Sequence, residues 1–185
     1  MRRKIFFYCT AALSIIALIS ALNSPDAALA KGEVKINIRW EYMDFPLKIE
    51  ARLLNGKARL WETTSVADAF EAPIGDTIKD SSFSLKPGEA LRFVLVVTNP
   101  TDKDAYFFAG PHAVTPIEHS LGFKFKCLCV NSSFLVKAGE TWYRVVEFRL
   151  SQDFVGNEIT VTHTIVGIDK ERAEAFGSAQ HDEHD

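Results

Sequence analysis

The chain has 185 residues, 47% of them hydrophobic, which is enough for one domain with a substantial core and too little for two full domains. Its formal net charge is −3, from 21 basic and 24 acidic residues. This acidic balance argues against nucleic acid as a partner.

Residues 1–30 are predicted to be a signal peptide or an N-terminal membrane anchor. Residues 2–4 are basic, residues 5–22 form an uncharged run, and Ala28 and Ala30 form an A-x-A cleavage signature. The run is long for a signal peptide and close to the shortest length that spans a bilayer, so both alternatives stay open. Either one exports the domain, and we expect it near the membrane, in the periplasm or on the outer face of the inner membrane. Cleavage after Ala30 would remove three basic residues and one acid and make the net charge −5.

Residues 31–169 are predicted to form an all-β domain, an antiparallel β sandwich, because runs with a period of two residues alternate with turn residues. The run VKINIRW, from Val34 to Trp40, places four apolar side chains on one face. The run LKIEARLL, which starts at Leu47, repeats this pattern and is followed by NG, a pair typical of tight hairpin turns. The next strand is therefore expected to pass through Leu60.

The remaining elements are predicted from the same kinds of signal. Residues 65–72 are expected to form a short helix that ends before Pro73, in a connection between strands. Residues 90–98, ALRFVLVVT, are apolar on both faces and predict a central strand. The runs GFKFKCLCV, ETWYRVVEFRLS and NEITVTHTIVGID predict three more strands, and residues 170–185 are expected to be a polar, mobile tail.

Two of the three cysteines, Cys127 and Cys129, are two residues apart, while Cys9 lies within the uncharged N-terminal run. In an oxidising compartment such a pair usually indicates a disulfide. In an extended strand, however, residues i and i+2 are about 6.6 Å apart, whereas a disulfide needs Cβ atoms about 3.8 Å apart. We therefore expect the pair to stay reduced unless the segment is kinked.

Two thiolates on one face can instead bind one metal ion, since two metal–sulfur bonds of about 2.3 Å span roughly 4.6 Å. Soft thiolates select Cu(I) or Zn(II), and a site with only two of them lacks the four ligands of structural zinc. The predicted cofactor is therefore Cu(I), bound by Cys127 and Cys129, with Lys124 and Lys126 expected to favour the thiolate form. The alternative is a pair of small apolar residues packed in a strand, because C-x-C is a weak motif.

The histidines offer further ligands with less support. His112 and His119 precede the cysteines, and either could supply a third ligand if the loop folds back, although each alone is more often a surface residue. His163 shares a face with three apolar residues and is interpreted as a core histidine outside the site. His181 and His184 could bind a divalent ion weakly but are more typical of a solvated tail.

No serine, histidine and acid combination has supporting motif context, and no phosphate-binding glycine loop is present in the sequence. The chain is therefore predicted not to be an enzyme.

Four motifs follow one another between residues 98 and 140. They are TNPTDK from Thr98 to Lys103, Val114 with Pro116, Cys127 with Cys129, and Gly139 with Glu140. In order and spacing this segment resembles the CtaG family of cytochrome c oxidase assembly proteins, which are copper chaperones. The resemblance covers residues 83–167, about half of the chain. It implies an immunoglobulin-like fold, a Cu(I) site at the cysteine pair, and delivery of copper to the binuclear centre of the oxidase.

The chain also departs from the family pattern. Leu128 and Val130 stand where the motif has aromatic residues, and one extra residue separates the cysteine pair from the glycine turn. Family members carry a further cysteine after a membrane anchor, whereas Cys9 here lies inside the uncharged run. A three-cysteine site or a cysteine-bridged dimer is therefore not carried over, and a homodimer is left open.

The predicted function is that of an exported Cu(I) chaperone. It would pass copper by ligand exchange to the apo copper site of a membrane oxidase subunit, such as one of cytochrome c oxidase, during assembly. The alternative is a copper-independent periplasmic binding or structural β sandwich module whose cysteines are merely buried.

Overall fold

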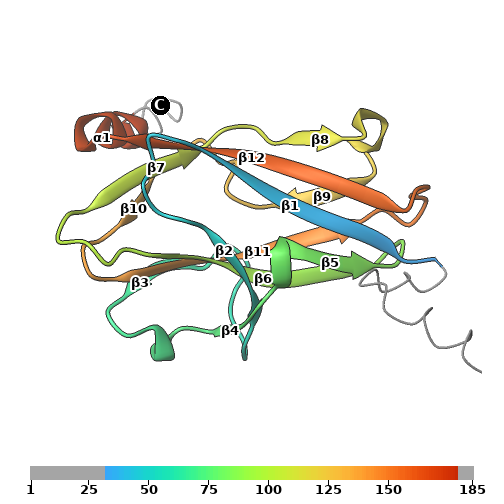
Figure 1. Cartoon of the computed structure of the whole chain (residues 1–185), viewed down its shortest axis with the longest axis horizontal. Helices are drawn as coiled ribbons and strands as arrows, with labels where there is room; N and C mark the ends of the chain where they lie inside the picture. Colours follow the sequence, from blue (N-terminus) through green and yellow to red (C-terminus); the bar gives the residue numbers. More distant parts are fainter. Residues whose placement is uncertain (1–31, 179–185) are drawn as a thin grey trace, which may run out of the picture.

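The structure is a computed structural model that describes residues 32–178, which form two six-stranded sheets packed face to face (Figure 1). The first sheet has the order β10-β7-β12-β1-β5, with β8 also paired to β12, and the second has the order β3-β11-β6-β2-β4, with β9 also paired to β11. The strands of the first sheet are β1 (Val34–Met43), β5 (Ser82–Leu85), β7 (Ala105–Ala109), β8 (Ala113–Thr115), β10 (Phe134–Val136) and β12 (Glu158–Ile168). Those of the second sheet are β2 (Glu50–Leu54), β3 (Thr63–Val66), β4 (Ile74–Thr77), β6 (Ala90–Thr98), β9 (Phe123–Lys126) and β11 (Thr141–Leu150).

This arrangement confirms the predicted all-β sandwich. Among the strand pairs of residues 32–178, only β1 with β12 is parallel, and the others are antiparallel. The core lies between the sheets, where alternate side chains such as Ile36, Phe93, Phe148 and Ile159 are fully buried. The immunoglobulin-like strand arrangement that the resemblance implies stays a prediction, because two packed sheets do not by themselves establish it.

Strand β6 is the predicted central strand, with the predicted bounds, and it lies between β11 and β2. One face contributes Phe93 and Val97 to the main core. Val94 and Val96, on the other face, belong to a smaller apolar cluster that residues of the segment 54–74 cover from outside. Both faces of β6 are therefore apolar because both are buried.

The same cover explains why the predicted hairpin at Asn55 is wrong. Strand β2 pairs with β4 and β6, and residues 57–60 form no strand. Ala58 and Ile74 instead pack on the outer face of the second sheet, against the smaller cluster. The predicted helix in residues 65–72 shrinks to a single 3-10 turn, Ala69–Glu71, capped by the side chain of Asp68. Two more 3-10 turns lie at Lys79–Ser81 and Ile117–His119.

The predicted mobile tail begins, in the structure, with helix α1 (Lys170–Ser178). Its Phe176 ring packs on Phe108 of β7, with ring centres 5.2 Å apart, and Ser133 Oγ donates a hydrogen bond to Ala173 O. The signal or anchor at residues 1–30 and the tail histidines lie outside the described residues. Within residues 32–178, no helix is long and apolar enough to span a membrane.

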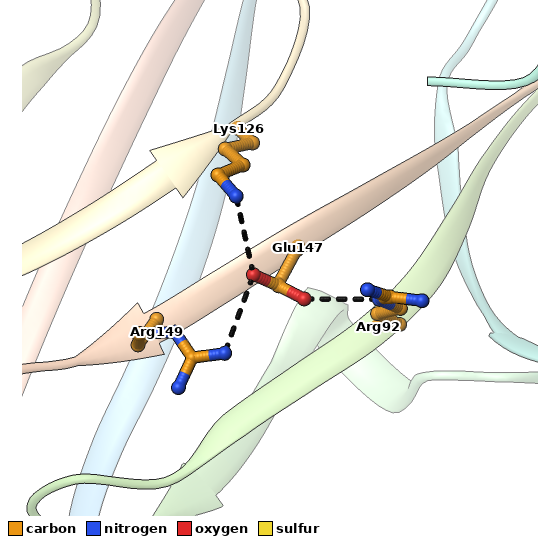
Figure 2. Close-up of polar contacts among 4 residues, drawn as sticks. All are labelled: Arg92, Lys126, Glu147 and Arg149. Atoms are coloured by element: carbon orange, nitrogen blue, oxygen red, sulfur yellow. Dashed lines mark hydrogen bonds and ion pairs between the residues drawn. The ribbon is translucent and has the colours of Figure 1, made fainter. Parts of the chain in front are cut away.

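The outer face of the second sheet carries a cluster of charges around Glu147 of β11 (Figure 2). Its carboxylate accepts a hydrogen bond of 2.9 Å from Arg92 Nε and lies 3.6 Å from both Lys126 Nζ and Arg149 Nη2. The Glu147 side chain is only 6% exposed, whereas the three cations are about half exposed. The pKa of Glu147 is lowered from its ordinary value of 4.5, mainly by the hydrogen bond from Arg92, while burial acts in the opposite direction.

Replacing Glu147 by glutamine should lower the free energy of unfolding by about 1 to 3 kcal/mol at pH 7, because three cations then face a neutral group. The carboxyl pKa is lower in the folded state, so this difference is fully present above pH 4.5 and disappears as the pH falls through the folded-state value. Urea unfolding of both proteins at decreasing pH measures it. A difference that did not change with pH would contradict an electrostatic origin.

Candidate metal centre

One ligand position comes from β12 and a bulge opposite it. His163 points into the sandwich from β12 and is fully buried. Gly110 N bonds to Thr164 O, and Ala113 lies opposite Thr162, so His163 stands against two residues, Pro111 and His112. A β-bulge of this kind re-aims the side chain of the longer strand, and here it brings His112 toward His163, with ring centres 5.4 Å apart.

The cysteines lie where the chain crosses from the second sheet to the first. Strand β9 ends at Lys126, and the chain resumes as β10, in the other sheet, at Phe134. Between these strands the chain bends. Val130 N donates a hydrogen bond of 2.7 Å to Leu128 O, which closes a tight turn. Leu128 is fully buried and anchors this crossing in the core.

The prediction of an extended strand through both cysteines is therefore wrong beyond Lys126. The bend places Cys127 Sγ and Cys129 Sγ only 3.4 Å apart. The kink that would permit a disulfide is present, so strand geometry no longer keeps the thiols apart. Cys127 is buried and Cys129 is exposed, and both are free in the structure.

The two cysteines and two histidines form one group, which we call the Cys2His2 cluster: His112, Cys127, Cys129 and His163. The Nδ1 atoms of both histidines lie 3.5 Å from Cys129 Sγ. One nitrogen or sulfur of each residue lies within 4.8 Å of those of the other three, and the group could hold a metal ion. Cys129 Sγ also lies 3.4 Å from the carbonyl oxygen of Gly110, to which a thiol can donate.

His163 differs from the core histidine expected from its apolar neighbours. Its ring stacks on Trp40, with centres 5.2 Å apart and an angle of 21° between planes. Its Nε2 atom is buried without a hydrogen-bond partner in residues 32–178, and Nδ1 faces Cys129. A buried ring nitrogen without a partner is costly. The His163 nitrogen that faces the cysteines, and so could bind a metal ion between them, is Nδ1. The sequence signal, a histidine on an otherwise apolar strand face, is typical of a core histidine as well as of a buried ligand, so it does not by itself indicate the site.

The other predicted third ligand, His119, lies outside the cluster. It ends the 3-10 turn Ile117–His119, and its ring packs on Phe154 with centres 4.8 Å apart. Of the two loop histidines, the structure therefore brings only His112 to the cysteines.

The pKa directions of the two thiols are opposite. The hydrogen bond between them lowers the pKa of Cys127 most, His112 and His163 lower it further, and burial acts against them. The same hydrogen bond and burial raise the pKa of Cys129. Lys126, one of the two lysines that the sequence predicts to favour the thiolate, instead extends to Glu147 on the outer face of the sheet (Figure 2). The basic groups that lower the pKa of Cys127 are His112 and His163.

The donor set fits a tetrahedral ion better than a linear one. A linear arrangement of two 2.3 Å metal–sulfur bonds needs sulfurs about 4.6 Å apart, and a tetrahedral arrangement needs about 3.8 Å. The observed 3.4 Å is close to the second value. With four donors the cluster offers the number of ligands that structural zinc needs, so it suits either Cu(I) or Zn(II).

Mild oxidation of the metal-free protein should join Cys127 and Cys129 in an intramolecular disulfide and abolish metal binding, because their sulfurs are already neighbours. Thiol counting on the unfolded protein and mass spectrometry of the peptide that contains both residues measure this. Two thiols that stay free under an oxidant able to oxidise an exposed dithiol would contradict it.

The fold and the cluster together define a β sandwich protein with a candidate Cys2His2 metal centre at the edge between its sheets. Residues 34–168 match the model of a family described as a domain of unknown function, DUF8709, and the chain belongs to this family. A comparison with curated proteins found no match.

Proposed function

We propose that the protein is an exported Cu(I) chaperone, in which Cys127 and Cys129 carry the copper ion and His112 and His163 complete its coordination. Copper is here the cargo. It is released, in the periplasm or at the outer face of the inner membrane, to the apo copper site of a membrane oxidase subunit, such as one of cytochrome c oxidase. No catalytic step is needed.

The observation that carries the proposal is the unequal exposure of the four donors. Cys127 and His163 are buried and His112 is half-buried, whereas Cys129 is exposed. An incoming thiolate or imidazole of the acceptor can therefore reach the ion beside Cys129 while the buried donors still hold it. Such a site suits ligand exchange, because the acceptor adds a bond before the carrier gives one up.

The rival proposal is a copper-independent module with structural cysteines. It accounts for Cys127, which is only 4% exposed, but it gives no reason for an exposed thiol directed at two histidine rings. A structural zinc ion is also poorly motivated, since the domain already has a continuous core of large apolar residues between its sheets.

Titration of the reduced protein with Cu(I), against a chelator of known affinity, tests the proposal. We expect one Cu(I) per chain, bound tightly enough to compete with the chelator, and no such binding by the variant in which Cys127 and Cys129 are both serine. Equal copper binding by the wild-type protein and this double variant would refute it.

A further inference from the structure

Arg144 of β11 is a buried cation beside the cysteine pair. The residue is 8% exposed and lies on the inward side of its strand, with its guanidinium carbon 5.3 Å from the ring centre of Phe134. A buried charge is stable only when it is paired or well hydrogen-bonded. In residues 32–178, Arg144 forms no ion pair with a carboxylate.

Two hydrogen bonds fix the position of the guanidinium. Its Nε donates to the backbone oxygen of Cys127 at 3.2 Å, and its Nη1 donates to Thr63 Oγ1 at 2.7 Å. The acid next to Thr63 along the chain, Glu62, accepts hydrogen bonds from Tyr143 Oη and the Arg59 backbone and, within residues 32–178, forms no ion pair with Arg144. The negative charge that acts on the Arg144 guanidinium is that of the Cys127 thiolate, and Arg144 is held beside it by the bond to the Cys127 carbonyl.

The donor set suits both Cu(I) and Zn(II), but the charge around it distinguishes these two ions. Two thiolates and two neutral imidazoles carry a charge of −2, and Arg144 adds +1. A monovalent ion makes the cluster and Arg144 neutral together, whereas a divalent ion leaves one uncompensated positive charge beside the buried Cys127, His163 and Arg144. An uncompensated buried charge is unfavourable because the interior has a low dielectric constant.

We infer that Arg144 is the counter-charge of the Cys2His2 cluster and makes the cluster selective for a monovalent soft cation, Cu(I), over a divalent cation such as Zn(II). This inference rests on the proposed function and adds the class of ion that the site accepts. Arg144 does not touch the ion. It acts through its charge and through the Cys127 carbonyl that it holds.

The most direct test changes the charge of Arg144's surroundings and keeps Arg144 itself. Thr63 is exposed on the edge strand β3, and its side chain already meets Nη1. In Thr63→Asp, a carboxylate at this position should pair with Arg144 and cancel its charge. Thr63→Asn has nearly the same shape without the charge and is the matched control.

The measurement is the ratio of the Cu(I) and Zn(II) association constants, each obtained with a competing chelator on the reduced full-length chain. Relative to wild type, Thr63→Asp should lower this ratio at least about tenfold, as a change of one nearby charge in a partly buried site predicts. Thr63→Asn should leave it within about threefold, because it adds no charge.

A second pair of variants acts on Arg144 itself. Arg144→Gln removes the charge and should also lower the ratio, whereas Arg144→Lys keeps the charge and should largely restore it. Circular dichroism and the unfolding midpoint report whether each protein folds. If Arg144→Gln does not fold, the Thr63 pair still decides the result.

Suppose that the wild-type protein binds Cu(I) through its cysteines, but Thr63→Asp and Thr63→Asn have the same ratio of Cu(I) to Zn(II) association constants. This result would overturn the role of Arg144 and leave the copper proposal standing. Wild-type protein whose Cu(I) binding is independent of the cysteines would overturn both. A lower ratio in Thr63→Asp and an unchanged ratio in Thr63→Asn are the expected results.

Discussion

Replacing either Cys127 or Cys129 by serine should lower the affinity for Cu(I) at least about 100-fold, because each change removes a thiolate ligand. Loss of a residue that only hydrogen-bonds to a metal ligand already costs 10- to 100-fold. A hydroxyl is a harder donor and suits a soft ion poorly. The double variant should be little worse than either single variant, since the two sulfurs act as one unit on one ion. Chelator competition with the reduced proteins measures all three affinities.

The two single variants should differ in stability. Cys127 is buried, so Cys127→Ser should lower the free energy of unfolding by about 1 to 3 kcal/mol through a poorly satisfied hydroxyl. Cys129 is exposed, so Cys129→Ser should change it by less than about 0.5 kcal/mol. Cys9→Ser, the same substitution outside the described residues, is the control for copper binding. Lost stability with unchanged copper affinity in both cluster variants would contradict the chaperone proposal.

The sandwich could be predicted from the sequence because its signals are local. Alternation along β1 and the two apolar faces of β6 follow directly from which side chains are buried. The predicted hairpin at Asn55 is wrong because a local turn signal carries no information about the outer face of the second sheet. That face needs apolar cover, and the segment after β2 supplies it.

The metal centre could be predicted only in part, because its donors come from three separate segments. The cysteine spacing marks Cys127 and Cys129, but the bend between them depends on Leu128 entering the core as the chain changes sheets. The His112 side chain reaches His163 because of the bulge opposite His163. This bulge forms only when β7 and β8 both pair with β12. No local pattern encodes such a register shift.

The position of Arg144 cannot be predicted from the sequence either. Either of the two arginines in the run ETWYRVVEFRLS, Arg144 and Arg149, has the character of a solvent-facing strand position. In the structure Arg144 shares the inward face of β11 with Trp142 and Val146, and its charge becomes informative only because Cys127 lies beside it. Its role therefore depends on the tertiary contact between β11 and the cysteine segment.

The fully buried imidazole of His163 leads to a prediction that separates function from stability. His163→Leu should lower the affinity for Cu(I) at least about tenfold, because it removes a direct donor of the cluster, whereas loss of a residue that only supports a ligand already costs 10- to 100-fold. The free energy of unfolding of the metal-free protein, in contrast, should rise by about 1 kcal/mol. The substitution removes the unpartnered buried Nε2, and this gain exceeds the loss of the stacking on Trp40.

Urea unfolding of the metal-free protein and chelator competition with Cu(I) measure the two effects of His163→Leu separately. His119→Leu is the matched control, because His119 packs on Phe154 outside the cluster, and this change should leave the Cu(I) affinity unaltered. A metal-free His163→Leu protein less stable than wild type by more than about 2 kcal/mol would identify His163 as a core residue satisfied by the fold. The opposite result, greater stability with weaker copper binding, is what a buried histidine retained for a metal ion requires, because a fold optimised for packing alone would gain from an apolar residue at this position.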